Sequence, residues 1–446
     1  DLESFPALAA AICVVHDETL SHRINENTAT AVDPVDLFGY FKSLRTILGT
    51  PPELLINVVD ASASIEELRW AASKYAGDTK VGDRYFDVKY DNEHFLKGAP
   101  KQVTVAGFNL RNILQHGGVC ADQAYFASHI GKAIGVPTSY VFGRNAESSH
   151  AWVGYLGVRS GSRPQWNFDS GRYPGYRGVR GTVTDPQTRR RVPDSSLSLM
   201  ADSSVTSADN RRIAVAFTDA SLRMTILSKG ASPFPPAEPS VYTKSKPVRT
   251  TALADRLDVL EAGLKRCPTY SPAWDILVES AQAGELSLKH KKRWAENLDK
   301  LCAGKYPDFS LDIFRAMVQT IDNPQEQSKM WDALFSGYQN RPDLAAEIRI
   351  AQGLLWEKAG DRSKAWDCYQ DILARFADDG PFTVSAAQRS ERLLRDAGKD
   401  RDVLPMFAAL WPRLTEPRSA APEFRGQSNW TRIGLLYLAA LEREGQ

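Results

Sequence analysis

The sequence predicts an α+β fold, in which a helix packs on an antiparallel sheet, followed by an all-α region. Two glycines precede Cys120 at the start of a helix-like segment, and three segments rich in β-branched and aromatic residues follow, at 138–142, 150–156 and 165–169. Prolines then accumulate between 228 and 249, and beyond them apolar residues recur at helical spacing. These observations indicate a mixed domain, a linker and a helical domain.

Length and composition narrow the class of protein. A chain of 446 residues exceeds one ordinary hydrophobic core, so two or three domains are expected. The 55 basic and 54 acidic side chains leave a net charge of +1, which gives no reason to expect nucleic acid or an anionic membrane as a partner. No stretch approaches the ~20 apolar residues of a membrane span. Five cysteines without a C-x-x-C pair argue against a disulfide framework, and we expect no metal or other cofactor.

The first domain begins with helices that are expected to cover the core, over residues 1–80. Asp33 before a proline is typical of a helix start, and Ser64 with Glu67 has the pattern of a capping box. Segment 84–90 is predicted as a strand and 108–114 as a short helix. The chain starts at Asp1 instead of Met, which indicates either a processed precursor or a truncated sequence. Of these, removal of an export signal is preferred, so an exported or periplasmic location is favoured.

The predicted catalytic domain, 81–227, supplies a nucleophile, a base and a carboxylate in order. Cys120 opens a helix, where unpaired backbone N–H groups favour the thiolate and lower the thiol pKa. Neighbouring strands lie roughly 5 Å apart, so His150 and Asp169 are predicted to be hydrogen-bonded cross-strand neighbours. Asp169 then fixes the imidazole tautomer and leaves the other ring nitrogen facing Cys120.

Two further features of the sequence near Cys120 bear on its environment: a row of small residues on the same helix, and the side-chain amide of Gln115. Cys120, Ala124, Ala127 and Gly131 form a strip along one helix face, which allows another element to pack closely. Gln115 is predicted to donate to a developing oxyanion, together with the backbone N–H of Cys120. The alternative for Gln115 is a loop amide that only ties down the glycine turn.

Gly118-Val119-Cys120, His150-Ala151-Trp152 and Asp169 together resemble the motifs of the transglutaminase-like superfamily, over roughly residues 80–195. The resemblance implies a cysteine-bearing helix on an antiparallel sheet that carries His and then Asp. Members include protein cross-linking enzymes, cysteine proteases, peptide deglycosylases and inactive modules, so the fold does not name the substrate. Cross-linking relatives often carry a tryptophan that helps to hold the oxyanion, whereas the nearest upstream one here, Trp70, belongs to a separate predicted helix. Its role is left to Tyr85, Tyr90 or Gln115, of which Gln115 is the first candidate.

The rest of the chain carries a hairpin, a linker and helices. Segment 181–192 is predicted as a hairpin whose arginines form a solvated face, with a grip on an acidic substrate as the alternative. The proline-rich linker spans 228–250, and 251–446 is predicted to be all-α. Within it, 344–376 resembles a tetratricopeptide-type hairpin with a Gly-Asp turn. Tryptophans at helical spacing are expected in its core, at positions 274, 294, 331, 356, 366, 411 and 430.

Together these features predict a thiol-dependent acyl-transfer enzyme acting on a protein or peptide substrate. Cys120 attacks an amide carbonyl, His150 protonates the departing amine, and water or a second amine resolves the thioester. Water makes a protease or amidase, which is favoured because no second acceptor site is evident, and a lysine amine makes a transglutaminase. The alternative is an inactive scaffold whose helical repeats bind a peptide or protein partner. Structural roles for Cys120, His150 and Asp169 are further alternatives, and joint zinc binding is disfavoured without a paired motif.

Overall fold

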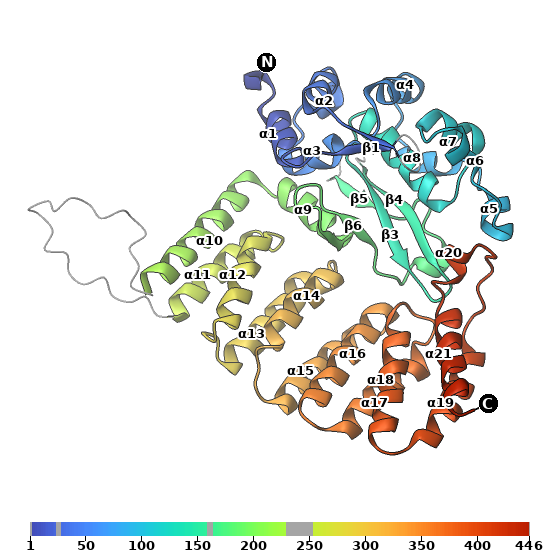
Figure 1. Cartoon of the computed structure of the whole chain (residues 1–446). Helices are drawn as coiled ribbons and strands as arrows, with labels where there is room; N and C mark the ends of the chain where they lie inside the picture. The colour runs from blue at the N-terminus through green and yellow to red at the C-terminus, as the bar shows by residue number, and fades with distance from the viewer. Residues whose placement is uncertain (1, 24–27, 158–163, 229–252, 446) are drawn as a thin grey trace, which may run out of the picture. The chain divides into compact units, whose positions relative to one another are not determined.

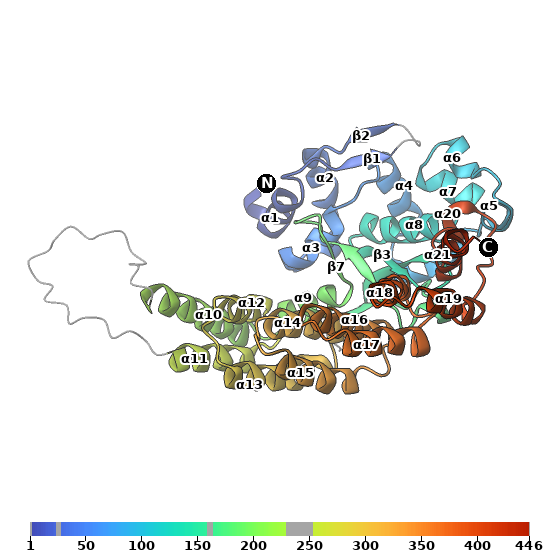
Figure 2. The ribbon, with the colours of Figure 1, turned by 60° about the horizontal axis from the view of Figure 1, so that its bottom comes forward.

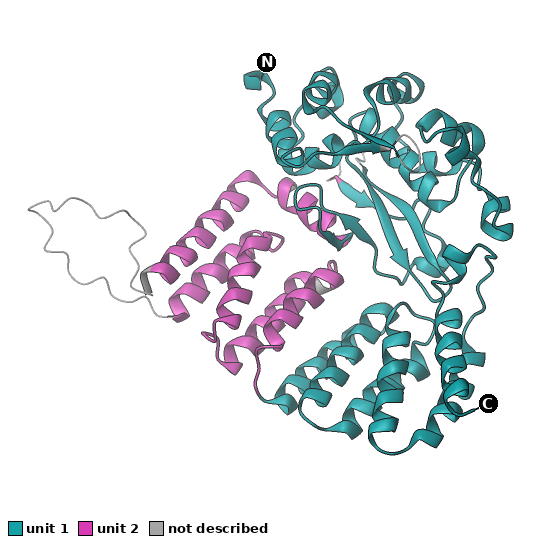
Figure 3. Ribbon diagram, viewed as in Figure 1, with its two compact units in different colours: residues 1–160, 165–194, 323–446 teal, residues 161–164, 195–322 magenta. Residues whose placement is uncertain are grey.

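The computed structural model describes residues 2–23, 28–157, 164–228 and 253–445. The chain divides into two compact units (Figure 3). Unit 1 comprises residues 1–160, 165–194 and 323–446, and unit 2 comprises residues 161–164 and 195–322. The fold is therefore α+β, with small antiparallel sheets and a helical C-terminal region.

These units divide the chain differently from the predicted domain boundaries. Residues 195–227 group with the helices that follow residue 252, and residues 323–446 group with the predicted catalytic domain. Helical periodicity is the same in both units, so the amphipathic pattern alone does not reveal which helices share a core. Apart from Ser228, the predicted linker lies outside the described residues.

Helices and a short ribbon form the N-terminal part of unit 1. The Asp33 carboxylate accepts from the backbone N–H of Val35, and Ser64 and Glu67 form the predicted capping box. The ribbon of β1 and β2 lies beside α2 and α4 (Figure 2). The elements are η1 (Leu2–Ser4), α1 (Pro6–Val15), β1 (Ser21–Arg23), β2 (Ala29–Ala31), α2 (Pro34–Phe41), η2 (Arg45–Ile47), α3 (Pro52–Val59), α4 (Ile65–Tyr75), η3 (Val81–Asp87), α5 (Asn92–Lys97), α6 (Gln102–Ala106) and α7 (Leu110–His116).

The core of unit 1 is helix α8 (Cys120–Ala133), which packs against strands of a five-stranded antiparallel sheet (Figure 1). The strand order is β5-β4-β3-β6-β7. The predicted helix and its three following strands are thus confirmed, as is the later hairpin. The strands are β3 (Thr138–Arg144), β4 (Ser149–Gly157), β5 (Gln165–Asn167), β6 (Thr182–Thr184) and β7 (Arg191–Pro193), with the short helix η4 (Pro174–Tyr176) after β5.

The predicted strip of small residues does permit close packing of α8. Cys120, Ala124 and Ala127 form one buried cluster with Ala151 and other residues of β4. A Cβ on Gly131 would lie 2.2 Å from Cγ2 of Thr138, so this position requires glycine.

The prediction of a strand over 84–90 was wrong. The segment forms the 3-10 helix η3, and beyond it Tyr90 makes only an isolated bridge to Gly118. Within this helix Tyr85 is fully buried and donates through its hydroxyl to the Ala151 carbonyl, 3.1 Å away, while Phe86 is exposed. Aromatic residues are enriched in strands, but here the buried ring is held by a 3-10 helix.

Residues 323–446 form a helical array within unit 1. The predicted hairpin is confirmed: α16 and α17 pack together and are joined across Gly360, whose φ of +79° suits glycine. The array contains α15 (Pro324–Gly337), α16 (Pro342–Lys358), α17 (Arg362–Arg375), α18 (Phe382–Asp396), η6 (Asp400–Asp402), α19 (Val403–Leu410), η7 (Trp411–Arg413), α20 (Pro422–Arg425) and α21 (Asn429–Arg443).

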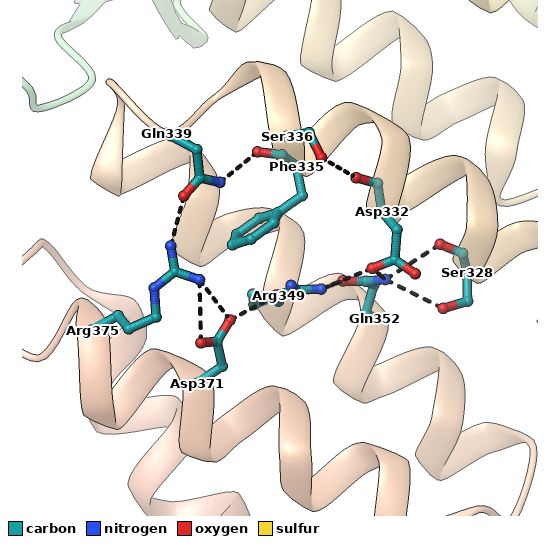
Figure 4. A network of polar contacts seen from close by, with 9 residues as sticks. All are labelled: Ser328, Asp332, Phe335, Ser336, Gln339, Arg349, Gln352, Asp371 and Arg375. Atoms are coloured by element: carbon teal, nitrogen blue, oxygen red, sulfur yellow. Dashed lines mark hydrogen bonds and ion pairs between the residues drawn. The ribbon is translucent and has the colours of Figure 1, made fainter.

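Arg349 joins three helices of this array (Figure 4). Its Nε donates to Asp371 on α17 at 2.8 Å, and its Nη1 donates to Asp332 on α15 at 2.9 Å. The guanidinium also lies 3.7 Å from the centroid of the Phe335 ring, and Nη1 donates to Gln352 on its own helix. Because a planar guanidinium bonds in fixed directions, this side chain sets the spacing of α15, α16 and α17.

Unit 2 is helical in its described part. Trp274 and Trp294 are fully buried and meet edge to face, which fits the expectation that they are core residues. Among the described residues, no helix combines the length and apolar character needed to cross a membrane. The helices are α9 (Ser195–Val205), α10 (Ala208–Ser228), α11 (Leu253–Arg266), α12 (Ser271–Gln282), α13 (Leu288–Leu298), the π-helix η5 (Asp299–Ala303) and α14 (Pro307–Val318).

Candidate active site

Cys120 is the first residue of α8, and a tight turn brings the chain into it. Gly117 adopts a φ of +81°, and a Cβ there would lie 2.4 Å from the Lys89 carbonyl oxygen. The Asp122 carboxylate accepts from the backbone N–H of Val119 at 2.8 Å and pairs with Lys101 at 2.7 Å. These contacts fix the first turn of the helix and therefore the position of the sulfur.

The thiol is buried, with 6% of Cys120 exposed. Burial raises the thiol pKa, hydrogen bonds from the backbone N–H groups of Ala151 and Ala121 lower it, and the Asp122 carboxylate raises it further. The net direction is upward, opposite to the prediction from the helix N-terminus. Desolvation outweighs the helix dipole here, so the resting sulfur is a neutral thiol.

Tyrosines surround this thiol. Tyr85, Tyr90, Tyr173 and Tyr176 each have a pKa raised first by burial, and proximity to Cys120 contributes to every one of these shifts. The hydroxyls of Tyr85 and Tyr173 share a hydrogen bond, and Tyr173 is 40% exposed. The surroundings of the thiol are therefore aromatic, and Tyr173 is the most exposed of these four tyrosines.

His150 lies at the second position of β4, with its ring held by a backbone carbonyl. Its Nε2 is 2.6 Å from the Gly171 oxygen, and its ring stacks on Tyr173 with centroids 4.2 Å apart. A carbonyl only accepts hydrogen bonds, so Nε2 carries the proton and Nδ1 carries the lone pair. Burial lowers the His150 pKa to about 4, while the Gly171 bond raises it. The imidazole is thus neutral, in the tautomer that a base acting through Nδ1 requires.

The Cys120 sulfur and the His150 imidazole lie on opposite faces of β4. Ala151 and Val153 point toward α8 and contact Cys120, whereas His150 and Trp152 alternate to the other face, where their rings contact each other. Among the described residues no hydrogen bond joins Cys120 to His150. Cys120 therefore packs against Ala151, the residue after His150, and the predicted thiol–imidazole hydrogen bond is not among the contacts of the described residues.

Asp169 does not orient His150, contrary to the prediction. Strand β5 ends at Asn167, which pairs with Tyr155, and continuing this register sets Asp169 level with Val153 instead of His150. The Asp169 side chain is exposed, and its backbone N–H donates to Asn167 Oδ1 at 2.8 Å. The His150 ring instead contacts the Gly171 carbonyl, in the chain that follows β5, and no side-chain motif signals a backbone acceptor.

Gln115 is not brought to the thiol by any hydrogen bond of the described residues. It is exposed on α7, two residues before the Gly117 turn. The backbone N–H of Cys120 lies in the first turn of the helix, where N–H groups lack an intrahelical acceptor, and no hydrogen bond from it is found among the described residues. Of the arginines of the 181–192 hairpin, Arg190 and Arg191 are exposed, as a solvated face requires, although Arg191 also lies over the Phe142 ring. Arg189 instead donates to the Val15 carbonyl.

The C-terminal array holds the turn that precedes His150. The backbone N–H of Asn429 donates to the Ala146 carbonyl at 2.6 Å, and the guanidinium of Arg144 donates to the Gln427 carbonyl. From the other side, the Tyr176 hydroxyl donates to the Ser148 carbonyl at 3.2 Å. The end of β3 and the turn that leads to His150 are therefore held by Gln427 and Asn429, at the start of α21, and the Arg144–Gln427 pair is 283 residues apart in the chain.

Known proteins offer no guide to this site. Comparisons with family models, with curated proteins and with solved structures gave no match. Within the described residues, no group of three His, Cys, Asp or Glu side chains is placed to hold a metal ion. Any function has to be inferred from the residues of the chain itself.

Proposed function

We propose that unit 1 carries a transglutaminase-like, thiol-dependent acyl-transfer enzyme that acts on amide or peptide bonds. One observation carries the proposal. The Cys120 sulfur lies at the first turn of α8 and accepts a hydrogen bond from the N–H of Ala151, the residue directly after His150. The nucleophile and a base of the right tautomer thus lie on two elements that pack together, α8 and β4, and the base is the residue next to the one that contacts the sulfur.

The reaction follows from the groups present. Cys120 Sγ attacks the substrate carbonyl while its proton passes to His150 Nδ1, and backbone N–H groups of the first helical turn stabilise the oxyanion. The C–N bond breaks as His150 returns that proton to the departing amine, which leaves a thioester. Water, deprotonated by His150, or a second amine then attacks the thioester and restores the thiol. In this scheme the Gly171 carbonyl takes the orienting role first assigned to Asp169.

The resting geometry implies general-base catalysis without a preformed ion pair. Both the thiol and the imidazole are neutral at pH 7, because burial raises one pKa and lowers the other. The ring has to approach the sulfur when substrate binds, and Tyr173, stacked on His150 and partly exposed, is the side chain that the substrate displaces.

An inactive scaffold is the second candidate, and it is favoured by the absence of a carboxylate at the His150 ring among the described residues. In that case the triad residues are vestigial and the helical array binds a peptide or protein partner. The buried, neutral thiol is compatible with both candidates.

Turnover of a peptide library, with and without a fluorescent primary amine, separates these candidates. Peptide cleavage that is lost in Cys120→Ser and in His150→Ala supports a hydrolase, and incorporation of the amine with the same losses supports a transglutaminase. Turnover that persists in Cys120→Ser rejects the thiol-dependent mechanism. Complete absence of turnover in the folded chain also rejects the proposed enzyme and leaves the inactive scaffold.

A further inference from the structure

A groove of about 640 Å³ lies in the C-terminal array, away from the residues of the candidate active site. One face of α17 forms one wall and α19 with its flanking turns forms the other, while the end of α18 completes the lining. The lining residues of α17 run from Arg362 to Ala374, so the wall extends over roughly 18 Å at 1.5 Å per residue.

The floor and the walls of this groove are apolar. Leu373, Leu394 and Leu410 are buried at its base, and Trp366 and Met406 remain partly exposed. Trp366 thus departs from the expectation that the tryptophans of this region are core residues. In the described part of the chain its indole N–H has no hydrogen-bond partner. Tryptophan, methionine and arginine are the residue types enriched at protein-binding surfaces.

Cations dominate the rim. Arg362, Lys399 and Arg413 line the groove, and Asp402 is the single carboxylate among the lining residues. Arg362 and Arg413 donate to backbone carbonyls, and none of the three cations has a carboxylate within ion-pair distance in the described residues. Elsewhere in the array, by contrast, arginines such as Arg349 and Arg389 are paired with acids. The groove therefore presents unneutralised positive charge beside an apolar surface.

The walls also restrict the shape of an occupant. They are helices whose backbone groups bond internally, so they offer side chains and no sheet edge to pair with. A peptide entering an apolar groove of this kind has to satisfy its own backbone groups, which a helix does.

We propose that this groove binds a short amphipathic helix with an acidic flank, supplied by a protein partner. Two or three apolar side chains at helical spacing contact Trp366, Met406 and the leucines, and flanking carboxylates contact Arg362, Lys399 and Arg413. This binding does not depend on the acyl-transfer function, and it is measured without turnover.

The test is selection of a displayed library of random peptides, about 15 residues long, on the full chain carrying Cys120→Ser, so that no peptide is cleaved. An enriched peptide is then titrated by fluorescence anisotropy against this chain and against its R362E/R413E double variant. The matched control is K358E/R432E, which changes the net charge equally at cations outside the groove.

The expected result is enrichment of acidic peptides with apolar residues at i, i+3 or i+4, and i+7. Their binding weakens at least tenfold in R362E/R413E and in Trp366→Ala, and less than twofold in K358E/R432E. Three outcomes overturn the proposal: no enrichment, enriched peptides without acidic residues, or equal weakening in the control. Self-association of the chain that R362E/R413E abolishes assigns the groove to a second copy and overturns it as well.

Discussion

The Nε2 atom of His150 donates to the carbonyl oxygen of Gly171 over 2.6 Å, and the Asp169 carboxylate two residues earlier stays exposed. A backbone oxygen thus sets the imidazole tautomer. Since a carbonyl bears no formal charge, it stabilises an imidazolium less than a carboxylate does, which fits the lowered pKa of His150.

Replacement of Asp169 by Asn is therefore expected to have little effect on catalysis. We expect kcat/KM to fall less than about tenfold in Asp169→Asn, and by about 10²–10⁴ in His150→Ala, the usual contribution of a positioned base. The measurement is steady-state turnover of a peptide found in the library assay, with far-UV circular dichroism to confirm that both variants fold. Equal losses in the two variants mean that Asp169 orients the ring after all.

The free energy of unfolding should decrease as the pH is lowered, because His150 is buried in its neutral form. Its pKa is about 4 in the folded chain against 6.5 in the unfolded one, so between these values the unfolded chain binds more protons. Stability is then complete above pH 6.5 and decreases as pH falls toward 4, by up to about 3 kcal/mol.

Urea unfolding of the wild type and of His150→Gln between pH 7 and pH 4 measures this contribution. His129 titrates in the same direction, with a pKa lowered to about 3 by burial, and it is common to both proteins. The wild type should lose stability more steeply than His150→Gln. Parallel pH profiles mean that His150 is not held neutral by the fold.

Gly171 should be unusually sensitive to a methyl group. Its φ is +79°, and a Cβ would lie 2.6 Å from the Tyr85 ring, which packs beside the thiol. Gly171→Ala is expected to lower the free energy of unfolding by about 1–3 kcal/mol through overpacking, in addition to the cost of left-handed backbone, and to slow acylation of Cys120.

Gly49→Ala is the matched control for this variant. Gly49 has the same φ of +79°, but no atom lies within 4 Å of the position that a Cβ would take there. It therefore carries the left-handed cost, about 1–2 kcal/mol, without the clash. Equal destabilisation of the two variants, measured by urea unfolding, contradicts the packing of Tyr85 against Gly171.

Much of the local structure was predictable from the sequence. The capping box of Ser64 and Glu67, the helix start at Cys120 and the turn at Gly360 depend on residues within one or two turns of each other, so their signals are local. The strands that follow α8 were also predictable, because β-branched and aromatic residues bounded by turn residues mark each of them.

The register of β5 and the environment of the thiol were not predictable in this way. The His150 ring contacts the Gly171 carbonyl instead of the Asp169 carboxylate, in the chain that follows the β5 pairing, and no local sequence signal marks that backbone acceptor. The raised pKa of Cys120 depends on its burial among tyrosines from η3 and from the chain after β5. Long-range packing therefore reverses the effect expected from the helix N-terminus.

Arg349 should contribute to the stability of the helical array. Arg349→Lys keeps the charge but cannot reach Asp332, Asp371 and Gln352 together, so the free energy of unfolding is expected to fall by about 1–3 kcal/mol. Arg401→Lys, at an exposed position without an ion pair in the described residues, should stay within about 0.5 kcal/mol of the wild type. Urea unfolding compares the two, and similar values for both mean that the network of Figure 4 adds nothing to stability.

The most direct measurement of the central claim is trapping of the acyl-enzyme with p-nitrophenyl acetate, followed by intact mass and peptide mapping. If Cys120 is a nucleophile served by His150, one acetyl group is found on Cys120, acetylation slows by about 10² or more in His150→Ala, and it disappears in Cys120→Ser. Acetylation spread over the exposed Cys13 and other residues, with Cys120 unmodified in the folded protein, contradicts the account.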